Sequence, residues 1–287
     1  MKTYLDCYSC FIRQALEATR IAGKDETVQK EVLSYVMDLL KAMDMSVSPP
    51  MQAQVIHSFI REFTGLRDPY ESIKKEHNSE LLRLEPTFFE HVMNSPDPLR
   101  EALTLAGACN AIDMGPSRNW KHAEELYDQL MHPSLGRFDL EDFKQKLLSA
   151  KSMLYLADNA GEIVGDKILL SILEKNTDLD IVFVVRGGPV LNDATSKDAT
   201  MVGIDKMVQV ITTGSDCPGV VISDCSSEFK DAFDDADLIL AKGQGNYETL
   251  NQEKKEIFFL MQIKCRLVGR DLQSTEGEIL LTSISQI

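Results

Sequence analysis

The sequence lacks an excess of basic residues, and this absence limits the partners to expect. Its 287 residues include 30 lysines and arginines against 45 aspartates and glutamates, for a formal net charge of -15. Such a chain repels nucleic acid phosphates and anionic lipid surfaces unless a basic patch intervenes, and the sequence contains no such patch. We therefore expect neither nucleic acid nor membrane as a partner, and a phosphorylated substrate has to be attracted locally.

Long apolar runs are also missing. No stretch approaches the roughly 20 apolar residues needed to span a bilayer, and the amino-terminal residues lack the apolar run of a signal peptide. The six cysteines of such a chain are better explained as reduced thiols than as a disulfide framework. We expect a globular, cytoplasmic protein, and no feature of the sequence indicates an oligomeric state.

The first half of the chain has the pattern of successive helices. Apolar residues recur three and four positions apart, as at Phe11, Ala15 and Ala18, and strand signals are almost absent. Glycine and proline breaks punctuate the pattern. We predict an all-helical domain over residues 1–150.

The second half alternates short apolar runs with helical stretches. Nearly continuous apolar strands separated by helices indicate a mostly parallel sheet covered on both faces. We predict a three-layer α/β/α sandwich with a Rossmann-like sheet over residues 151–287. The expected strands are 153–157, 181–185, 207–211, 238–241, 266–268 and, at an edge, 278–282.

Polar residues follow three predicted strands, at the sheet edge where parallel sheets bind ligands. Asp158 and Asn159 follow the first strand, Asp193 the second and Lys242 the fourth. Two carboxylates and one amide oxygen form a set suited to Mg²⁺ or Mn²⁺. A bound divalent ion would orient a phosphoryl group and activate water, and Lys242 would attract the phosphate. The sequence therefore predicts a metal-dependent phosphohydrolase.

Each of these residues also has a structural interpretation. Asn159 with Glu162 is a possible capping box, Asp193 a possible helix N-cap, and Lys242 a possible surface residue. Taken singly, each is explained better by structure than by catalysis. The functional interpretation gains because all of them fall on one edge of one sheet.

Two other patterns support alternative functions. Gly243 and Gly245 resemble the opening of a dinucleotide-binding loop, although Glu248 occupies the third glycine position. The alternative is a protein that binds a nucleotide-like ligand, such as an S-adenosylmethionine-dependent carboxyl methyltransferase. Cys7 and Cys10 would share one helix face. This spacing allows a redox or zinc-dependent interaction module, but we favour a packing role for the pair.

Several motifs in order resemble the metal-dependent damage-control phosphatases, also catalogued as domain-of-unknown-function family 89. Residues 158–162, 186–195 and 242–248 carry most of the likeness. Cys7-Tyr8-Ser9-Cys10 looks like the CxxC of the prokaryotic branch. Residues 107–113 resemble the Gly-Asn-x-x-Asp element of the family, with two inserted residues. The resemblance covers nearly the whole chain.

This resemblance implies a helical domain packed on an α/β/α sandwich, with Mg²⁺, Mn²⁺, Co²⁺ or Ni²⁺ between them. By matching position, Asp158, Asn159 and Asp193 would ligate the ion. Such enzymes are taken to hydrolyse phosphate from small, reactive or damaged metabolites, including sugar phosphates. Attack by a metal-activated water is the leading mechanism, and direct attack of Asp193 on phosphorus is the alternative. The residues expected to bind the substrate or support the site are Glu162, Arg186, Lys242, Asn110 and Asp113.

Overall fold

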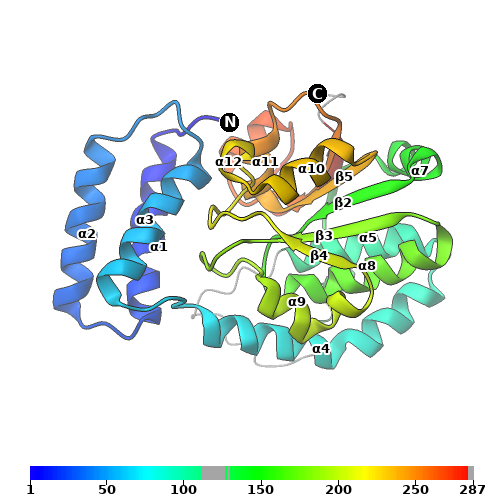
Figure 1. The fold of residues 1–287 in the computed structure, drawn as a ribbon, viewed down its shortest axis with the longest axis horizontal. Helices are drawn as coiled ribbons and strands as arrows, with labels where there is room; N and C mark the ends of the chain where they lie inside the picture. The colour runs from blue at the N-terminus through cyan, green and yellow to red at the C-terminus, as the bar shows by residue number, and fades with distance from the viewer. Residues whose placement is uncertain (111–126, 128–129, 284–287) are drawn as a thin grey trace.

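The computed structural model describes residues 1–110, 127 and 130–283, as a bundle of three helices beside a larger body built on one sheet (Figure 1). None of the described helices is long and apolar enough to cross a membrane. The helices are α1 (Asp6–Ile21), α2 (Glu26–Lys41), α3 (Pro49–Thr64), α4 (Glu71–Asn94), α5 (Pro98–Cys109), α7 (Leu140–Ser149), α8 (Glu162–Asn176), α9 (Ser196–Val202), α10 (Ser227–Asp235), α11 (Gly243–Leu250) and α12 (Arg266–Asp271). The strands are β1 (Leu135–Phe138), β2 (Ser152–Leu156), β3 (Asp180–Val185), β4 (Gln209–Thr212), β5 (Leu238–Lys242), β6 (Ile257–Gln262) and β7 (Ile279–Ser283).

The seven strands form a single sheet in the order β1-β7-β6-β5-β2-β3-β4. All pairs are parallel except β6 with β7. The chain runs from β2 through β3 to β4 in one direction, whereas β5 and β6 lie on the other side of β2. The direction reverses between β2 and β5, and the carboxyl ends of strands at such a reversal are where open parallel sheets usually bind ligands. The mostly parallel sheet predicted from the sequence is confirmed.

The carboxyl-terminal strands differ from those predicted. The strand expected at 266–268 is wrong, because these residues begin helix α12. The true strand is β6, a continuous apolar run whose residues are nearly all buried. Strand β7 is not at an edge, since it lies between β6 and β1. The edge strand beside β7 is β1, which lies within the half predicted to be all helical.

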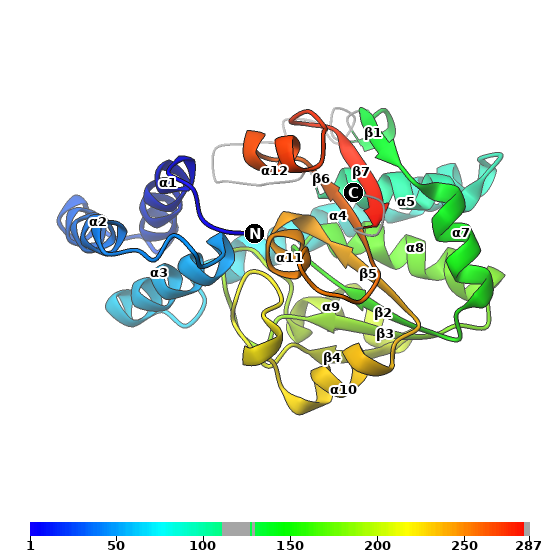
Figure 2. The same ribbon diagram turned by 90° about the horizontal axis from the view of Figure 1, so that it is seen from above.

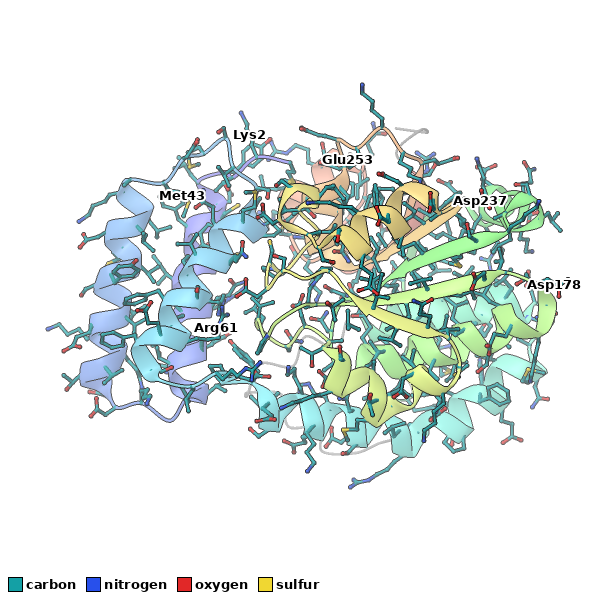
Figure 3. All side chains as sticks on the ribbon, in the orientation of Figure 1. Lys2, Met43, Arg61, Asp178, Asp237 and Glu253 are labelled. Carbon is teal, nitrogen blue, oxygen red and sulfur yellow. The ribbon has the colours of Figure 1, made fainter. Side chains whose placement is uncertain are left out.

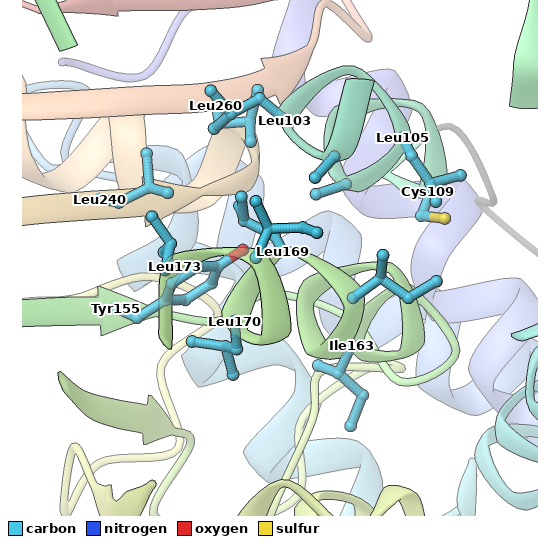
Figure 4. Packing of buried hydrophobic residues seen from close by; sticks show 14 of the residues in the cluster. Leu103, Leu105, Cys109, Tyr155, Ile163, Leu169, Leu170, Leu173, Leu240 and Leu260 are labelled. Carbon is cyan, nitrogen blue, oxygen red and sulfur yellow. The ribbon is translucent and has the colours of Figure 1, made fainter. Parts of the chain in front are cut away.

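The two faces of the sheet carry separate apolar layers. Along β5, Leu238 and Leu240 pack on one face, and Ile239 and Ala241 on the other, as alternation along a strand requires. Helices α5 and α8 cover the first face (Figure 4). Helix α4 also packs against α8, on that side of the sheet.

The α1–α3 bundle has an apolar core of its own, which includes Phe11, Val36 and Ile60. Figure 2 shows the bundle beside the sheet body, with α4 and α5 inside that body. The packing therefore changes between α3 and α4, well before the boundary predicted at residue 150. The sheet needs α4 and α5 as its covering layer, and this explains why helices from the first half join it.

Candidate functional site

Two loops at the carboxyl edge of the sheet bring three of the predicted residues together. Asp158 and Asn159 follow β2, and Asp193 lies in the loop that follows β3. Asn159 and Asp193 form an antiparallel bridge, and the amide of Ala194 donates to the carbonyl of Asp158 at 2.8 Å. Ala160 likewise donates to a carbonyl of the second loop. Backbone pairing therefore fixes these residues side by side, as the sequence predicted.

Buried polar groups surround the two carboxylates. Asp158 Oδ2 accepts hydrogen bonds from Asn110 Nδ2 at 2.9 Å and Asn159 Nδ2 at 2.7 Å. Arg186 Nε donates to Asp193 Oδ2 at 2.6 Å, and Arg186 Nη2 lies 3.6 Å from Asp158 Oδ1. Burial, with the nearby charges of Glu162 and Asp193, raises the pKa of Asp158 to about 7. Arg186 thus sits between two acids that are costly to ionise together.

Asn110 brings the helical half of the chain into contact with Asp158 and Glu162. It caps the carboxyl end of α5, and its Nδ2 also donates to Glu162 Oε2 at 2.8 Å. Its Oδ1 accepts the amide of Gln262 at the end of β6. Asn110 therefore joins three segments of the chain at one point. Asp113, predicted beside it, lies outside the described residues.

Lys242 does not occupy the position expected of a phosphate ligand. Its side chain has no exposed surface, and its ammonium donates to Ala106 O at 2.9 Å, Asp166 at 2.6 Å and Glu162 at 2.5 Å. These bonds use all three ammonium protons. The side chain points into the α5–α8 layer because it shares the strand face of Leu240. Direct contact with phosphate finds no support in this arrangement.

Lys264 is a cation near the site that the sequence analysis missed. It follows β6, at the same sheet edge, and its side chain is partly buried. Its positive charge acts to lower the pKa of Asp158, Glu162 and Asp193, against the effect of burial. A lysine just after a strand would have indicated this residue, but the sequence analysis did not predict β6 and so missed Lys264.

A buried asparagine of α4 ties the two loops to each other. Asn78 Oδ1 accepts the amide of Gly161 at 2.6 Å, and Asn78 Nδ2 donates to Asp198 Oδ1 at 2.9 Å. Asp198 forms a capping box with Thr195 at the start of α9. The N-cap is therefore Thr195 and not Asp193, whose carboxylate is directed to the site instead. A single asparagine within a helix gave no sequence signal for this role.

The glycines of the Gly243-Gln244-Gly245 segment are explained by close packing. Gly243 begins α11 with φ at +77°, and a Cβ there would lie 2.0 Å from Asp158 Oδ2. At Gly245, a Cβ would lie 2.1 Å from the carbonyl oxygen of Pro218. Glycine at both positions lets the backbone pass close to neighbouring atoms. Close packing therefore explains both glycines without a bound dinucleotide.

We expect Gly243→Ala to be more destabilising than Gly203→Ala. Both positions have positive φ, which costs about 1–2 kcal/mol for alanine, but nothing lies within 4 Å of a Cβ at Gly203. Overpacking against Asp158 should add about 1–3 kcal/mol at Gly243. Urea unfolding of the two variants measures the difference. Equal losses of unfolding free energy in the two variants would show that a Cβ at Gly243 does not clash with the carboxylate of Asp158.

The cysteine pair lies on helix α1 of the bundle. Cys7 and Cys10 share the first turns of α1, and both are partly buried free thiols. Burial is the main cause that raises the pKa of Cys7, and the charge of Glu248 raises it further. Within the described part of the chain, no group of three or more His, Cys, Asp or Glu side chains is arranged to hold a metal ion. The geometry thus gives no support to a zinc module.

Comparisons with known proteins agree with the motifs. The model of the damage-control phosphatase ARMT1-like domain matches residues 3–280. A damage-control phosphatase of Pyrococcus horikoshii is 29% identical over 97% of each chain. One of Archaeoglobus fulgidus is 31% identical over 95% of this chain and 96% of its own. A crystal structure of a family 89 protein from Pyrococcus horikoshii is similar with a TM-score of 0.90 and 28% identity, covering 98% of this chain and 99% of that one.

Proposed function

This chain belongs to the ARMT1-like damage-control phosphatase family and is a phosphatase, and we propose that it hydrolyses phosphomonoesters of small metabolites at the site of Asp158, Asn159 and Asp193. The observation that carries the proposal is the backbone bridge between Asn159 and Asp193, which joins two polar loops at the carboxyl edge of the sheet. Sugar phosphates and damaged phosphometabolites are the proposed substrates.

The proposed metal ligands fit a hard divalent cation. Asp158 and Asp193 supply carboxylate oxygens, and the nitrogen of Asn159 is the donor to Asp158 and Glu162, so its carbonyl oxygen is the atom suited to a cation. Mg²⁺, Mn²⁺, Co²⁺ and Ni²⁺ are the candidates for an oxygen set completed by water. When bound, such an ion supplies charge neutralisation at the phosphoryl group and lowers the pKa of a bound water.

The surrounding residues have distinct proposed roles. Arg186 holds the carboxylates of Asp158 and Asp193 in place, and its Nη2, which has no hydrogen-bond partner among the described residues, is directed to a substrate oxygen. Lys264, at the tip of β6, attracts the phosphate. Lys242 balances the buried charge of Glu162 and does not contact the substrate.

The test is phosphate release by chelator-treated protein, with each of the four metals added back. The substrates are p-nitrophenyl phosphate and a panel of sugar phosphates, and Asp193→Asn is the inactive control. We expect release that requires metal and disappears in the variant. Release that persists with excess chelator would contradict metal dependence. Adenine-nucleoside binding without any phosphatase activity would instead favour the methyltransferase alternative.

A further inference from the structure

The loop that carries Asp193 contains a strained residue. Leu191 has φ at +44°, a left-handed conformation that side-chain-bearing residues rarely adopt. The amide of Asp193 donates to the carbonyl of Val190 at 3.1 Å, so Leu191 lies inside a closed turn two residues before the proposed ligand. A conformation of this kind costs about 1–3 kcal/mol and persists only where the surroundings enforce it.

Packing against the helical bundle enforces this conformation. The Leu191 side chain packs against the bundle core of α1–α3. The cavity around it has a volume of about 10 Å³ and is lined by His57 and Ile60 of α3 and by Tyr70, which precedes α4. This space is about the minimum that one water needs, so the fit is close. The strain in the loop is thus offset by apolar contact with a separate part of the fold.

Polar contacts from α3 hold the same loop. Arg61, seen on α3 in Figure 3, donates from Nη1 to the carbonyl of Pro189 at 2.9 Å. It also forms an ion pair with Asp216, in the loop after β4. Gln54, two helical turns earlier, donates to Asp216 Oδ1 at 2.7 Å. Helix α3 therefore contacts both the loop that contains the strained turn and the loop after β4.

We propose that Leu191 is a positioning residue through which the α1–α3 bundle sets the geometry of Asp193, so that bundle docking and cation binding stabilise each other. This inference rests on the proposed function, because it takes Asp193 as a metal ligand. The coupling is reciprocal by thermodynamic necessity: if docking favours the cation, the cation favours docking by the same factor. The bundle is then part of the site and not only an appended domain.

The experiment combines Mn²⁺ titration calorimetry with hydrogen exchange of the full chain. In the wild type, Mn²⁺ should slow exchange in α3 as well as in residues 187–195. Leu191→Ala should weaken Mn²⁺ binding about tenfold, within the usual range of coupling between sites, and should abolish the slowing in α3. Arg61→Gln is the second variant, with a smaller loss of the same kind. Val55→Ala, at a half-exposed α3 position, is the matched control and should change neither.

The outcomes separate this inference from the proposed function. Wild-type Mn²⁺ affinity in both Leu191→Ala and Arg61→Gln would overturn the positioning role while leaving the metal site intact. Absence of Mn²⁺ binding in the wild type would remove the proposed metal site. In that case hydrogen exchange of the metal-free proteins tests the role of Leu191. The amides of residues 187–195 must exchange faster in Leu191→Ala than in the wild type, and equal exchange rates would overturn that role.

Discussion

An Asp158→Asn variant should lose about three orders of magnitude or more of phosphatase activity, because a metal-assisted step gains several kcal/mol from its cation and each 1.4 kcal/mol is about tenfold in rate. The fold should persist. Asparagine keeps an oxygen for the hydrogen bonds from Asn110 and Asn159. It also removes a buried charge that burial and neighbouring acids disfavour. Steady-state kinetics and urea unfolding of metal-free protein measure the two effects.

Asp178→Asn is the matched control for this prediction. Asp178 is exposed, and Figure 3 shows it at the end of the sheet opposite the bundle. It belongs to the Asp-Leu-Asp segment at the amino end of β3, which resembles the paired aspartates of other phosphatases but lies at the opposite end of the strand. We expect wild-type kinetics for this variant. Full activity in Asp158→Asn, or an equal loss in Asp178→Asn, would contradict the assigned site.

The sequence predicted the part of the site that depends on strand order. Because the apolar runs of β2 and β3 are strong and adjacent in the chain, the residues after them could be placed at one edge. Asp158, Asn159 and Asp193 could therefore be placed close together without a structure. Arg186 was found only as part of a family motif, since its contacts depend on how the loop folds back.

The remaining errors have physical causes. Residues 257–262 were not predicted to form a strand, although they are as apolar as the runs that were predicted to be strands. Lys264 was lost with it. Asn78 and Leu191 contact segments more than about eighty residues away in the chain, and no local pattern encodes such contacts. For Lys242 the information was present, since alternation with Leu240 directs its side chain to the sheet face that α5 and α8 cover.

Replacement of Lys242 by methionine should reduce the free energy of unfolding by about 3–5 kcal/mol, the usual cost of removing one partner of a buried ion pair. The ammonium lies between Glu162 and Asp166 and is fully buried. Methionine fills a similar volume but leaves two carboxylates facing each other without a cation. Urea unfolding of metal-free protein measures the loss.

A second substitution distinguishes charge balance from substrate binding at Lys242. Asp166→Asn added to Lys242→Met removes one of the two unbalanced charges and keeps an oxygen for the hydroxyl of Tyr155, which donates to Asp166 Oδ1 at 2.7 Å. We expect the double variant to recover part of the lost stability. A phosphate ligand would behave differently: Lys242→Met would then raise KM strongly at nearly unchanged stability, and Asp166→Asn would not restore it. That result would return Lys242 to the role first predicted from the sequence.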